Sequence, residues 1–254
     1  MWPIIWREIK LHYTKPYWLI SNFSSPLFYL LFFGLLFSRA MPGISVIGKN
    51  IPYLHFFIPG LIVMQSFFIF STSLALVNLD RRTRVIDMIN MTATSFFEYF
   101  LGRLVSVQGL TFMKSLLLWL VAVILFGFPV NIPAVAVFLV LIILLMSNFI
   151  WFGFGFALGL VIRTEDVRDI VAQLLILPLS FLSTIYYPAN NAPGILKIII
   201  TINPLTHAAN IVRPALLGLG HGPASSILTL AIYLTIVMVI LIYFIRRWSA
   251  TQEK

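Results

Sequence analysis

The stretch at residues 133–162 reads PAVAVFLVLIILLMSNFIWFGFGFALGLVI and contains no charged side chain. A run of about 20 apolar residues spans the hydrocarbon core of a bilayer as a helix, because every backbone polar group must be hydrogen-bonded within the segment. This run begins at Pro133 and ends just before the charged Arg163. It therefore predicts a transmembrane helix and indicates an integral membrane protein.

Similar apolar runs recur along the chain. Of its 254 residues, 60% are hydrophobic and 10% are charged, against roughly 45–50% and 25% in soluble domains. We predict an all-α integral membrane protein of one domain, residues 1–254, with six transmembrane helices. The predicted spans are residues 17–38, 57–79, 104–128, 133–162, 169–187 and 225–245.

Two shorter apolar stretches lie between the fifth and sixth predicted spans. Residues 194–202 and 205–219 are each too short to cross a bilayer, and Asn203-Pro204 separates them. Runs of this length are more often re-entrant or interfacial than spanning. We predict an outer re-entrant helical hairpin at residues 193–219, with a seventh span as the alternative.

The N-terminal segment, WPIIWREIKLHYT from Trp2 onward, has an amphipathic helical pattern. Trp2 and Trp6 share its apolar side, whereas Arg7 and Lys10 lie on the other side. We predict a cytoplasmic interfacial helix at residues 1–15 that contacts membrane lipid. The alternatives are a frayed charged terminus and a signal peptide, but the next apolar run exceeds the roughly 7–15 residues of a signal peptide's apolar region.

Lys and Arg residues are distributed unequally in this topology, and an excess of them marks cytoplasmic loops. We therefore predict that both termini face the cytoplasm, in a prokaryotic cytoplasmic membrane. All eight acidic residues also fall on the predicted inner side. The predicted inner cations are Arg7, Lys10, Lys15, Arg81, Arg82, Arg84, Arg103, Arg163, Arg168, Arg246, Arg247 and Lys254. The predicted outer cations are Arg39, Lys49, Lys197 and Arg213.

Several functions are excluded by what the sequence lacks. The chain has no cysteine, which rules out disulfides, thiolate zinc sites and cysteine nucleophiles. Its net charge of +9 arises from cations at the ends of apolar runs, so it indicates topology and not nucleic-acid binding. His55, His207 and His221 lie on the predicted outer side, where no carboxylate is available for a catalytic triad or a metal site. We predict no catalytic residue and no metal site.

Residues 43–50, GISVIGKN, come within one residue of the phosphate-binding loop G-x-x-x-x-G-K-[ST]. That loop follows a strand, opens a helix and offers a hydroxyl group to magnesium. Here Asn50 replaces the Ser or Thr, and Pro52 follows closely. The segment also falls in a predicted outer loop, away from cytoplasmic ATP. We interpret the similarity as accidental.

The longest predicted inner loop, residues 80–102, is also the most charged. Its first part, residues 80–90, predicts a short helix that docks its apolar side in a groove on a partner. The alternative is that the charges only mark a cytoplasmic loop. The candidate coupling residues are Asp80, Arg81, Arg82, Arg84, Val85, Asp87, Met88 and Ile89.

Two features inside the predicted spans carry further expectations. Gly155 and Gly159 have the spacing that allows close helix contact, either within the subunit or across a dimer. Lys114 is the one charged residue in the interior of a predicted span. An intramembrane lysine costs about 2.5–3.5 kcal/mol on insertion scales, so we expect it to face an aqueous path or to extend to the interface.

Short motifs follow one another along nearly the whole chain. They are Pro26-Leu27, Phe57-Ile58-Pro59-Gly60, the basic loop after the second span, Arg163-Thr164-Glu165-Asp166, Tyr186-Tyr187-Pro188, Pro193, and Asn203-Pro204-Leu205-Thr206 with Arg213. In this order and spacing, and with the N-terminal interfacial helix, the chain resembles the permeases of type-2 ABC exporters, close to the branch that exports drugs and lipo-oligosaccharides.

The resemblance implies six spans per subunit and an outer re-entrant hairpin with the motif residues Tyr187, Pro188, Asn203 and Pro204. It also implies that residues 80–90 contain a coupling helix, which fits a cleft on a cytoplasmic ATPase. Two soluble ABC ATPase subunits would bind ATP and Mg²⁺, and this chain would bind no cofactor. Two permease subunits, either identical or paralogous, would form one pathway.

These expectations predict an ATP-driven exporter of an amphipathic substrate, such as a drug, a lipid or a lipid-linked saccharide. The competing hypothesis is an ion-coupled secondary transporter, which normally buries carboxylates near the midplane. Apart from Asp169 at the first position of the fifth, no acidic residue lies within a predicted span. A membrane-embedded transferase is disfavoured, because neither face carries an acid–base cluster. Residues that line the path, or alternatively pack against lipid, are Phe23, Phe28, Tyr29, Phe32 and Lys114.

Overall fold

The computed structural model describes residues 16–40, 43–91, 95–189 and 192–252. Its first elements are helix α2 (Pro16–Ala40), strands β1 (Ile44–Val46) and β2 (Lys49–Ile51), and the long helix α3 (Tyr53–Arg82). The short helix α4 (Val85–Asn90) precedes α5 (Phe96–Phe126), α6 (Ala134–Val161) and α7 (Glu165–Phe181). The last described helices are α8 (Gly194–Ile202), α9 (Pro204–Leu216) and α10 (Ala224–Gln252).

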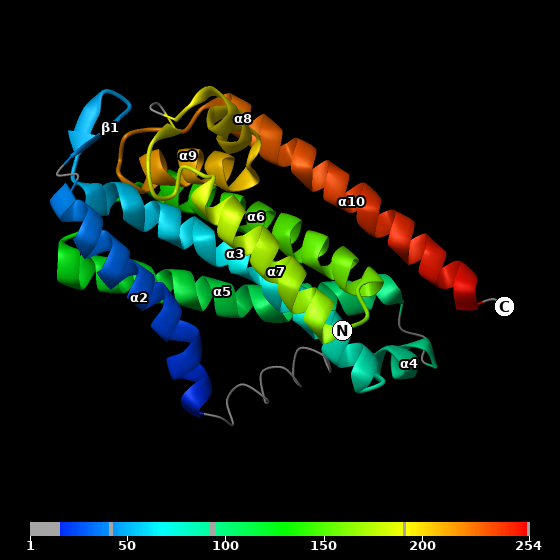
Figure 1. The fold of residues 1–254 in the computed structure, drawn as a ribbon. Helices are drawn as coiled ribbons and strands as arrows, with labels where there is room; N and C mark the ends of the chain where they lie inside the picture. Colours follow the sequence, from blue (N-terminus) through cyan, green and yellow to red (C-terminus); the bar gives the residue numbers. More distant parts are fainter. Residues whose placement is uncertain (1–15, 41–42, 92–94, 190–191, 253–254) are drawn as a thin grey trace.

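The helices form a bundle with two distinct ends. Helices α2, α3, α5, α6, α7 and α10 run between these ends (Figure 1). The hairpin of β1 and β2 lies at one end together with α8 and α9, whereas α4 lies toward the opposite end, where α10 also finishes (Figure 1). The two groups of connecting segments are therefore separated by the length of the bundle.

The outside of the bundle is apolar. Large apolar side chains are exposed on the long helices, including Phe28, Leu116, Phe138, Leu174 and Val239. Soluble proteins rarely expose a contiguous apolar surface of this kind, but the hydrocarbon core of a membrane accommodates it. The prediction of a mostly helical membrane protein is confirmed.

Four helices among the described residues are long and apolar enough to cross a membrane. They are Tyr53–Arg82, Phe96–Phe126, Ala134–Val161 and Ala224–Phe244. The bent pair of α8 and α9 gives a fifth if it forms one span, and α2 contributes a shorter apolar helix, Phe23–Arg39. Helix α7 has charged residues in its first turns and is not among these candidates. The structure thus has four to five candidate spans where the sequence predicts six.

Helices α3 and α6 form the central contact of the bundle, and small residues bring them together. A Cβ atom at Gly155 would overlap the Ser73 Oγ and the Phe70 carbonyl oxygen. A Cβ atom at Gly159 would lie 2.9 Å from the Val77 Cβ. The small residues predicted to allow close helix contact therefore do so within the subunit.

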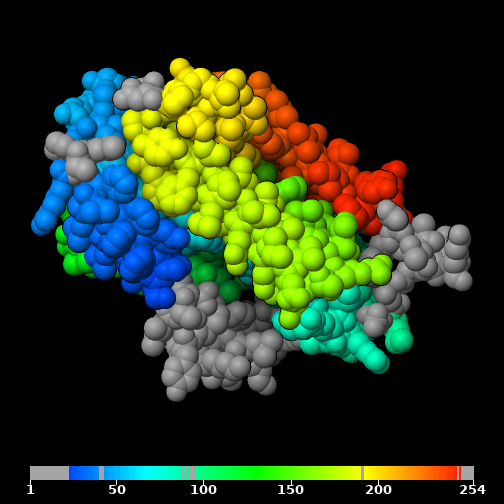
Figure 2. All heavy atoms as spheres, in the orientation of Figure 1, coloured from blue at the N-terminus to red at the C-terminus, as the bar shows by residue number. Residues whose placement is uncertain are grey.

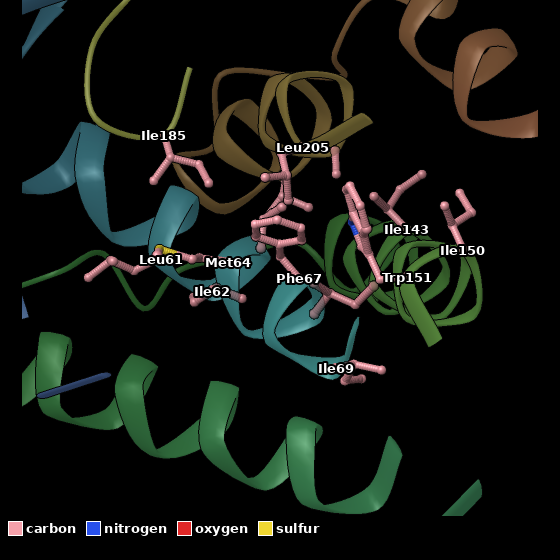
Figure 3. Packing of buried hydrophobic residues seen from close by; sticks show 14 of the residues in the cluster. Leu61, Ile62, Met64, Phe67, Ile69, Ile143, Ile150, Trp151, Ile185 and Leu205 are labelled. Carbon is pink, nitrogen blue, oxygen red and sulfur yellow. The ribbon is translucent and has the colours of Figure 1, made fainter. Parts of the chain in front are cut away.

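The same contact continues toward α9 through large apolar side chains. Trp151 of α6 packs edge-on against Phe67 of α3, with 4.4 Å between the ring centroids. Figure 3 shows both rings pointing toward each other, with Leu205 of α9 on the side of the cluster nearest that helix. Helix α9 is buried along most of its length, so it belongs to the core of the bundle and does not lie on its surface.

The loop after α2 departs from the all-α prediction. Residues 44–51 form two short antiparallel strands, with Ile44 opposite Ile51. Ile47 and Gly48 connect them with positive φ angles of 49° and 73°, as in the tight turns preferred by hairpins. The following helix begins only at Tyr53. Residues 43–50 therefore open no helix and lack the geometry of a phosphate-binding loop, in agreement with the interpretation from sequence.

Helix α7 differs from the fifth predicted span at both ends. It begins at Glu165, before the predicted start at residue 169, because acidic residues in a first turn stabilise the helix N-terminus. It ends at Phe181, and residues 182–187, which we predicted to be helical, form turns. The turn segment passes close to α3 at Gly60, where a Cβ atom would lie 3.0 Å from the Ile185 carbonyl oxygen.

Helices α8 and α9 meet at Asn203 with a bend of 74°. The Asn203 Oδ1 accepts a hydrogen bond from the Leu205 backbone N–H at 3.0 Å and caps α9. Pro204 occupies the first turn, where its missing N–H costs nothing. The interruption predicted from Asn203-Pro204 is thus a sharp helix boundary, compatible with a broken span or with a re-entrant loop.

Candidate functional site

The helix predicted at residues 80–90 is divided in the structure. Helix α3 continues through Asp80, Arg81 and Arg82, so these residues end the long helix and do not begin a coupling helix. The chain then turns at Thr83 and Arg84, where Arg84 has a φ of 56°. A left-handed φ ends a right-handed helix. The separate helix is α4 alone, which corrects the predicted start.

Asp80 does not face a partner, because it is fully buried. Its Oδ2 accepts hydrogen bonds from the Tyr99 hydroxyl at 2.5 Å and from the Arg103 Nε at 2.8 Å. Its Oδ1 accepts a hydrogen bond from the Arg103 Nη2. We predicted both charges to lie in a cytoplasmic loop. Instead they neutralise each other inside the bundle and join α3 to α5, which corrects the assignment of Asp80 to a partner interface.

The next two residues of α3 bind two other helices. Arg81 donates hydrogen bonds to carbonyl oxygens at the end of α6, those of Gly159 at 3.2 Å and Leu160 at 2.9 Å, and to the carbonyl oxygen of the following residue 162 at 3.1 Å. Such terminal carbonyls have no partner within their own helix. Arg82 forms an ion pair of 2.7 Å with Glu165 in the first turn of α7. These two cations therefore contact helices of the same subunit.

Helix α4 exposes an apolar side chain. Ile86 is buried, and Val85 and Ile89 are partly buried, with Ile89 packed against the core. Met88, in contrast, is 55% exposed. The side chain of Asp87 lies outside the described residues. Of the apolar face predicted for a partner, Met88 is the most exposed member.

A cleft of about 470 Å³ lies between α3 and the start of α7. Hydroxyl groups, apolar side chains and one residue of each charge line it, so its chemistry suits an amphipathic molecule. The lining residues are Ser71, Thr72, Ala75, Leu76, Leu79, Glu165 and Arg168. Figure 2 shows the beginning of α7 on the outside of the molecule, against the end of α3 and α4.

The residues predicted to line a path do not form one surface. Phe28 and Phe32 stack on each other at 5.4 Å and are 60% and 51% exposed on the outside of α2. Tyr29 instead packs toward α3, with its ring centroid 6.2 Å from that of Phe68. Lys114 is partly buried on α5, and Phe23 is partly buried on α2. The structure divides the five predicted residues between two helices and more than one face.

The motif at the other end of the bundle holds the end of α7. The Asn203 Nδ2 donates hydrogen bonds to the carbonyl oxygens of Leu179 and Leu182, both at 2.7 Å. The Tyr187 hydroxyl donates to the Phe181 carbonyl oxygen, and Pro188 follows in the same irregular segment. The Asn203 and Tyr187 side chains therefore fix the end of α7 and the turns that follow it.

Arg213 is buried and contributes to the same region. Its Nε donates to the Phe56 carbonyl oxygen at 2.9 Å, and its Nη2 donates to the Thr184 carbonyl oxygen. Its guanidinium group also lies 3.8 Å from the centroid of the Phe56 ring. Arg213 was predicted on the outer side, in the second stretch of the hairpin at residues 193–219. It lies in α9 and ties the turns after α7 to the start of α3.

Asn203→Ala is expected to destabilise this region by about 1–3 kcal/mol, because two carbonyl oxygens lose their donor and α9 loses its cap. The measurement is the thermal midpoint of the detergent-solubilised protein, followed by size-exclusion chromatography. Asn131→Ala is the control, since Asn131 is exposed in the loop before α6. Equal midpoints for the two variants would contradict the role assigned to Asn203.

Two further predictions concern the N-terminal segment and metal binding. The interfacial helix predicted at residues 1–15, with Trp2, Trp6, Arg7 and Lys10, lies outside the described residues. Among the described residues, no group of three or more His, Asp or Glu side chains is arranged to hold a metal ion.

Sequence reasoning missed Tyr99 and Arg103 as partners of Asp80. The available signal was a carboxylate and an arginine at the facing ends of two long apolar runs, the second and third predicted spans. Charges in such positions are also what an ordinary cytoplasmic loop carries. Only the packing of α3 against α5 distinguishes the two cases.

An apolar helical bundle with a short helix at one end and a bent helix pair at the other defines a multi-pass membrane protein. The chain belongs to the ABC-2 type transporter family, whose model matches residues 1–217. It is therefore the membrane subunit of an ABC transporter, and members of this family associate with ABC ATPase subunits.

Two relatives are similar over most of their length. A protein described as putative transport permease ycf38, from Cyanophora paradoxa, is 30% identical over 202 residues, which cover 78% of this chain and 68% of the relative. The daunorubicin resistance ABC transporter permease protein DrrB1 of Streptomyces coeruleorubidus is 24% identical over 220 residues, covering 87% and 74%.

Proposed function

We propose that this chain is the permease subunit of an ATP-driven exporter whose energy comes from a separate ABC ATPase. The observation that carries the proposal is α4, a short helix set off from α3 by a turn and carrying the exposed Met88. Two ATPase subunits bind ATP and Mg²⁺ and dock against α4. Two permease subunits, identical or paralogous, form the pathway.

The proposed topology has six crossings, made by α2, α3, α5, α6, α7 and α10, with α8 and α9 re-entrant on the outer side. The placement of α8 and α9 beside the β-hairpin, at the end opposite α4, supports this arrangement (Figure 1). Arginines at the α4 end support a cytoplasmic position for that end. Both termini then face the cytoplasm, in a prokaryotic cytoplasmic membrane.

The proposed substrate is an amphipathic molecule, such as a drug, a lipid or a lipid-linked saccharide. The cleft between α3 and α7 supports this class, because the apolar side chains of Leu76 and Leu79 line it together with the polar side chains of Ser71 and Thr72. The name of the daunorubicin resistance relative is compatible with an amphipathic substrate. Export moves the molecule away from the end at which ATP is hydrolysed.

Met88→Asp is expected to weaken the binding of the ATPase at least about tenfold, because it places a carboxylate in an apolar contact. The measurement is the dissociation constant of the purified permease for its partner ABC ATPase, together with the ATP hydrolysis of the complex. Binding as tight as that of the unchanged permease would show that α4 is not the docking helix.

Ile47→Asp is the matched control. Ile47 is also an exposed apolar residue, 62% exposed, but it lies in the β-hairpin turn at the opposite end of the bundle. Aspartate tolerates its positive φ better than isoleucine does, so the fold is preserved. A loss of binding in Ile47→Asp and not in Met88→Asp would reverse the proposed orientation.

The competing function, an ion-coupled secondary transporter, is disfavoured by the sequence because no acidic residue lies in the interior of a predicted span. The structure changes this argument, since Asp80 lies within a candidate spanning helix. However, Asp80 is neutralised by Arg103 and accepts a hydrogen bond from Tyr99. A carboxylate held in this way is a poor site for reversible ion binding, so the ATP-driven exporter remains the better proposal.

A further inference from the structure

The last turn of α3 is a junction, because three consecutive residues bind three different helices. Asp80 binds α5, Arg81 binds the end of α6, and Arg82 binds the first turn of α7. Helix α4 follows immediately after this turn. A force applied to α4 is therefore transmitted along the chain directly to the junction.

The three contacts differ in how easily they break. The contact of Asp80 with Arg103 is buried on both sides and has three donor groups for one carboxylate. The contacts of Arg81 are partly buried. The ion pair between Arg82 and Glu165 is open to solvent, with 57% and 44% of the side chains exposed. Exposed ion pairs contribute little to stability, so this contact is the one that opens first.

Helix α7 is also held less firmly along its length than α3, α6 or α9. Its buried residues are Ala172 and Ser180, and it packs mainly on α3. Close contacts at Gly155 and Gly159, in contrast, fix α6 against α3. The cleft next to the Arg82–Glu165 pair further separates α3 from the start of α7.

The opposite end of α7 is anchored by buried groups. The Asn203 Nδ2 binds the carbonyl oxygens of Leu179 and Leu182, and the buried Arg213 binds the carbonyl oxygen of Thr184 just beyond the helix. Helix α7 is thus fixed at its C-terminal end and joined to α3 at its N-terminal end by an exposed ion pair. If this ion pair breaks, α7 can rotate about its anchored C-terminal end.

We propose that residues 80–82 act as positioning residues for transport, with Arg82 and Glu165 forming a releasable latch. Asp80 and Arg81 keep α3, α5 and α6 together as one body. When the ATPase displaces α4, the Arg82–Glu165 pair opens and α7 swings away from α3 about its anchored end, which widens the cleft between them. This inference rests on the proposed function, because it requires an ATPase to act on α4.

The test measures distances between spin labels in the complex of the permease with its ATPase, in lipid nanodiscs. The chain has no cysteine, so labels attach only at introduced cysteines. Val105→Cys with Val167→Cys joins α5 to the start of α7, and Val105→Cys with Leu141→Cys joins α5 to α6. All three positions are exposed apolar residues. Dilution with unlabelled permease isolates the distances within one subunit.

Trapping the ATPase with ATP, Mg²⁺ and vanadate is expected to shift the 105–167 distance by several ångströms, the scale of a helix displacement of up to one turn. The 105–141 distance is expected to stay unchanged. An unchanged 105–167 distance, or equal shifts in both pairs, would overturn the proposal.

A second arm needs no ATPase. Arg82→Gln is expected to shift the 105–167 distance toward its trapped value without nucleotide, whereas Arg82→Lys, which keeps the charge, is expected to retain the resting distance. Arg84→Gln is the matched control, because Arg84 is an exposed arginine beyond the end of α3.

If Arg82→Gln leaves the 105–167 distance unchanged, the Arg82–Glu165 ion pair is not a latch. If the permease fails to bind the ATPase at all, the proposed function is wrong, and this arm still decides whether the ion pair holds α7.

Discussion

Asp80→Ala is expected to yield almost no folded permease. The carboxylate of Asp80 is fully buried and neutralises Arg103, which is only 1% exposed. Removal of one member of a buried ion pair costs about 3–5 kcal/mol, because the remaining charge loses its compensation in a low-dielectric environment. The measurement is the yield of monodisperse protein and its thermal midpoint in detergent. Asp166→Ala is the control, since Asp166 is an exposed carboxylate in the first turn of α7.

A triple variant separates the loss of charge balance from a simple loss of packing. Asp80→Ala combined with Arg103→Met and Tyr99→Phe removes both the charge and the donors that the carboxylate accepts. Replacing a whole buried ion pair by apolar residues is often nearly neutral, so folding is expected to recover. If the triple variant is as unstable as Asp80→Ala, charge compensation is not what Asp80 provides.

The parts of the fold that are predictable from sequence are those set by local composition. The charge-free run at 133–162 lies within one residue of α6 (Ala134–Val161) at each end, because Pro133 and Arg163 delimit it. The Asn203-Pro204 interruption marks a helix boundary for the same reason, since its capping chemistry is local.

The parts that sequence reasoning misplaced depend on contacts between distant segments. Helix α7 ends at Phe181 although the apolar run continues, because Arg213 and Asn203 hold the backbone of residues 182–187 in turns. Asp80 and Arg103 also look like loop charges until the two helices pack and pair them. Hydropathy treats every charge as a preference for water, and it therefore assigns the residues of a buried ion pair to a loop.

In the candidate site, too, the local sequence pattern predicted the helix, whereas contacts between distant segments decide which of its residues are exposed. The amphipathic pattern of residues 80–90 indicated a docking helix, and a separate helix does exist at α4. Which of its apolar residues is exposed was not predictable, because Ile86 and Ile89 are covered by tertiary packing, whereas Met88 is not. Likewise, the cations Arg81 and Arg82 were recognised as a group, but their individual partners on α6 and α7 follow only from the bundle.

Gly155→Ala and Gly109→Ala are expected to change stability in opposite directions, although both replace a glycine within a long helix. At Gly155 an added Cβ would overlap backbone and side-chain atoms of α3 at Phe70 and Ser73, so α3 and α6 have to separate. Overpacking of this kind costs about 1–3 kcal/mol, and more where backbone atoms obstruct relaxation. At Gly109, on α5, no atom lies within 4 Å of the added Cβ.

The expected gain at Gly109 is about 0.5–1 kcal/mol, because alanine loses less conformational freedom in a helix than glycine does. Thermal midpoints in the same detergent measure both effects. A lower midpoint for Gly155→Ala with an equal or higher midpoint for Gly109→Ala would establish that close approach at α3, and not helix propensity, requires glycine at position 155. Since α3 carries the junction at residues 80–82, Gly155→Ala is also expected to weaken the coupling between α4 and the bundle, which nucleotide-dependent distances between α5 and α7 would report. A Gly155→Ala protein as stable as the unchanged chain would mean that the contact of α3 with α6 is looser than these distances indicate.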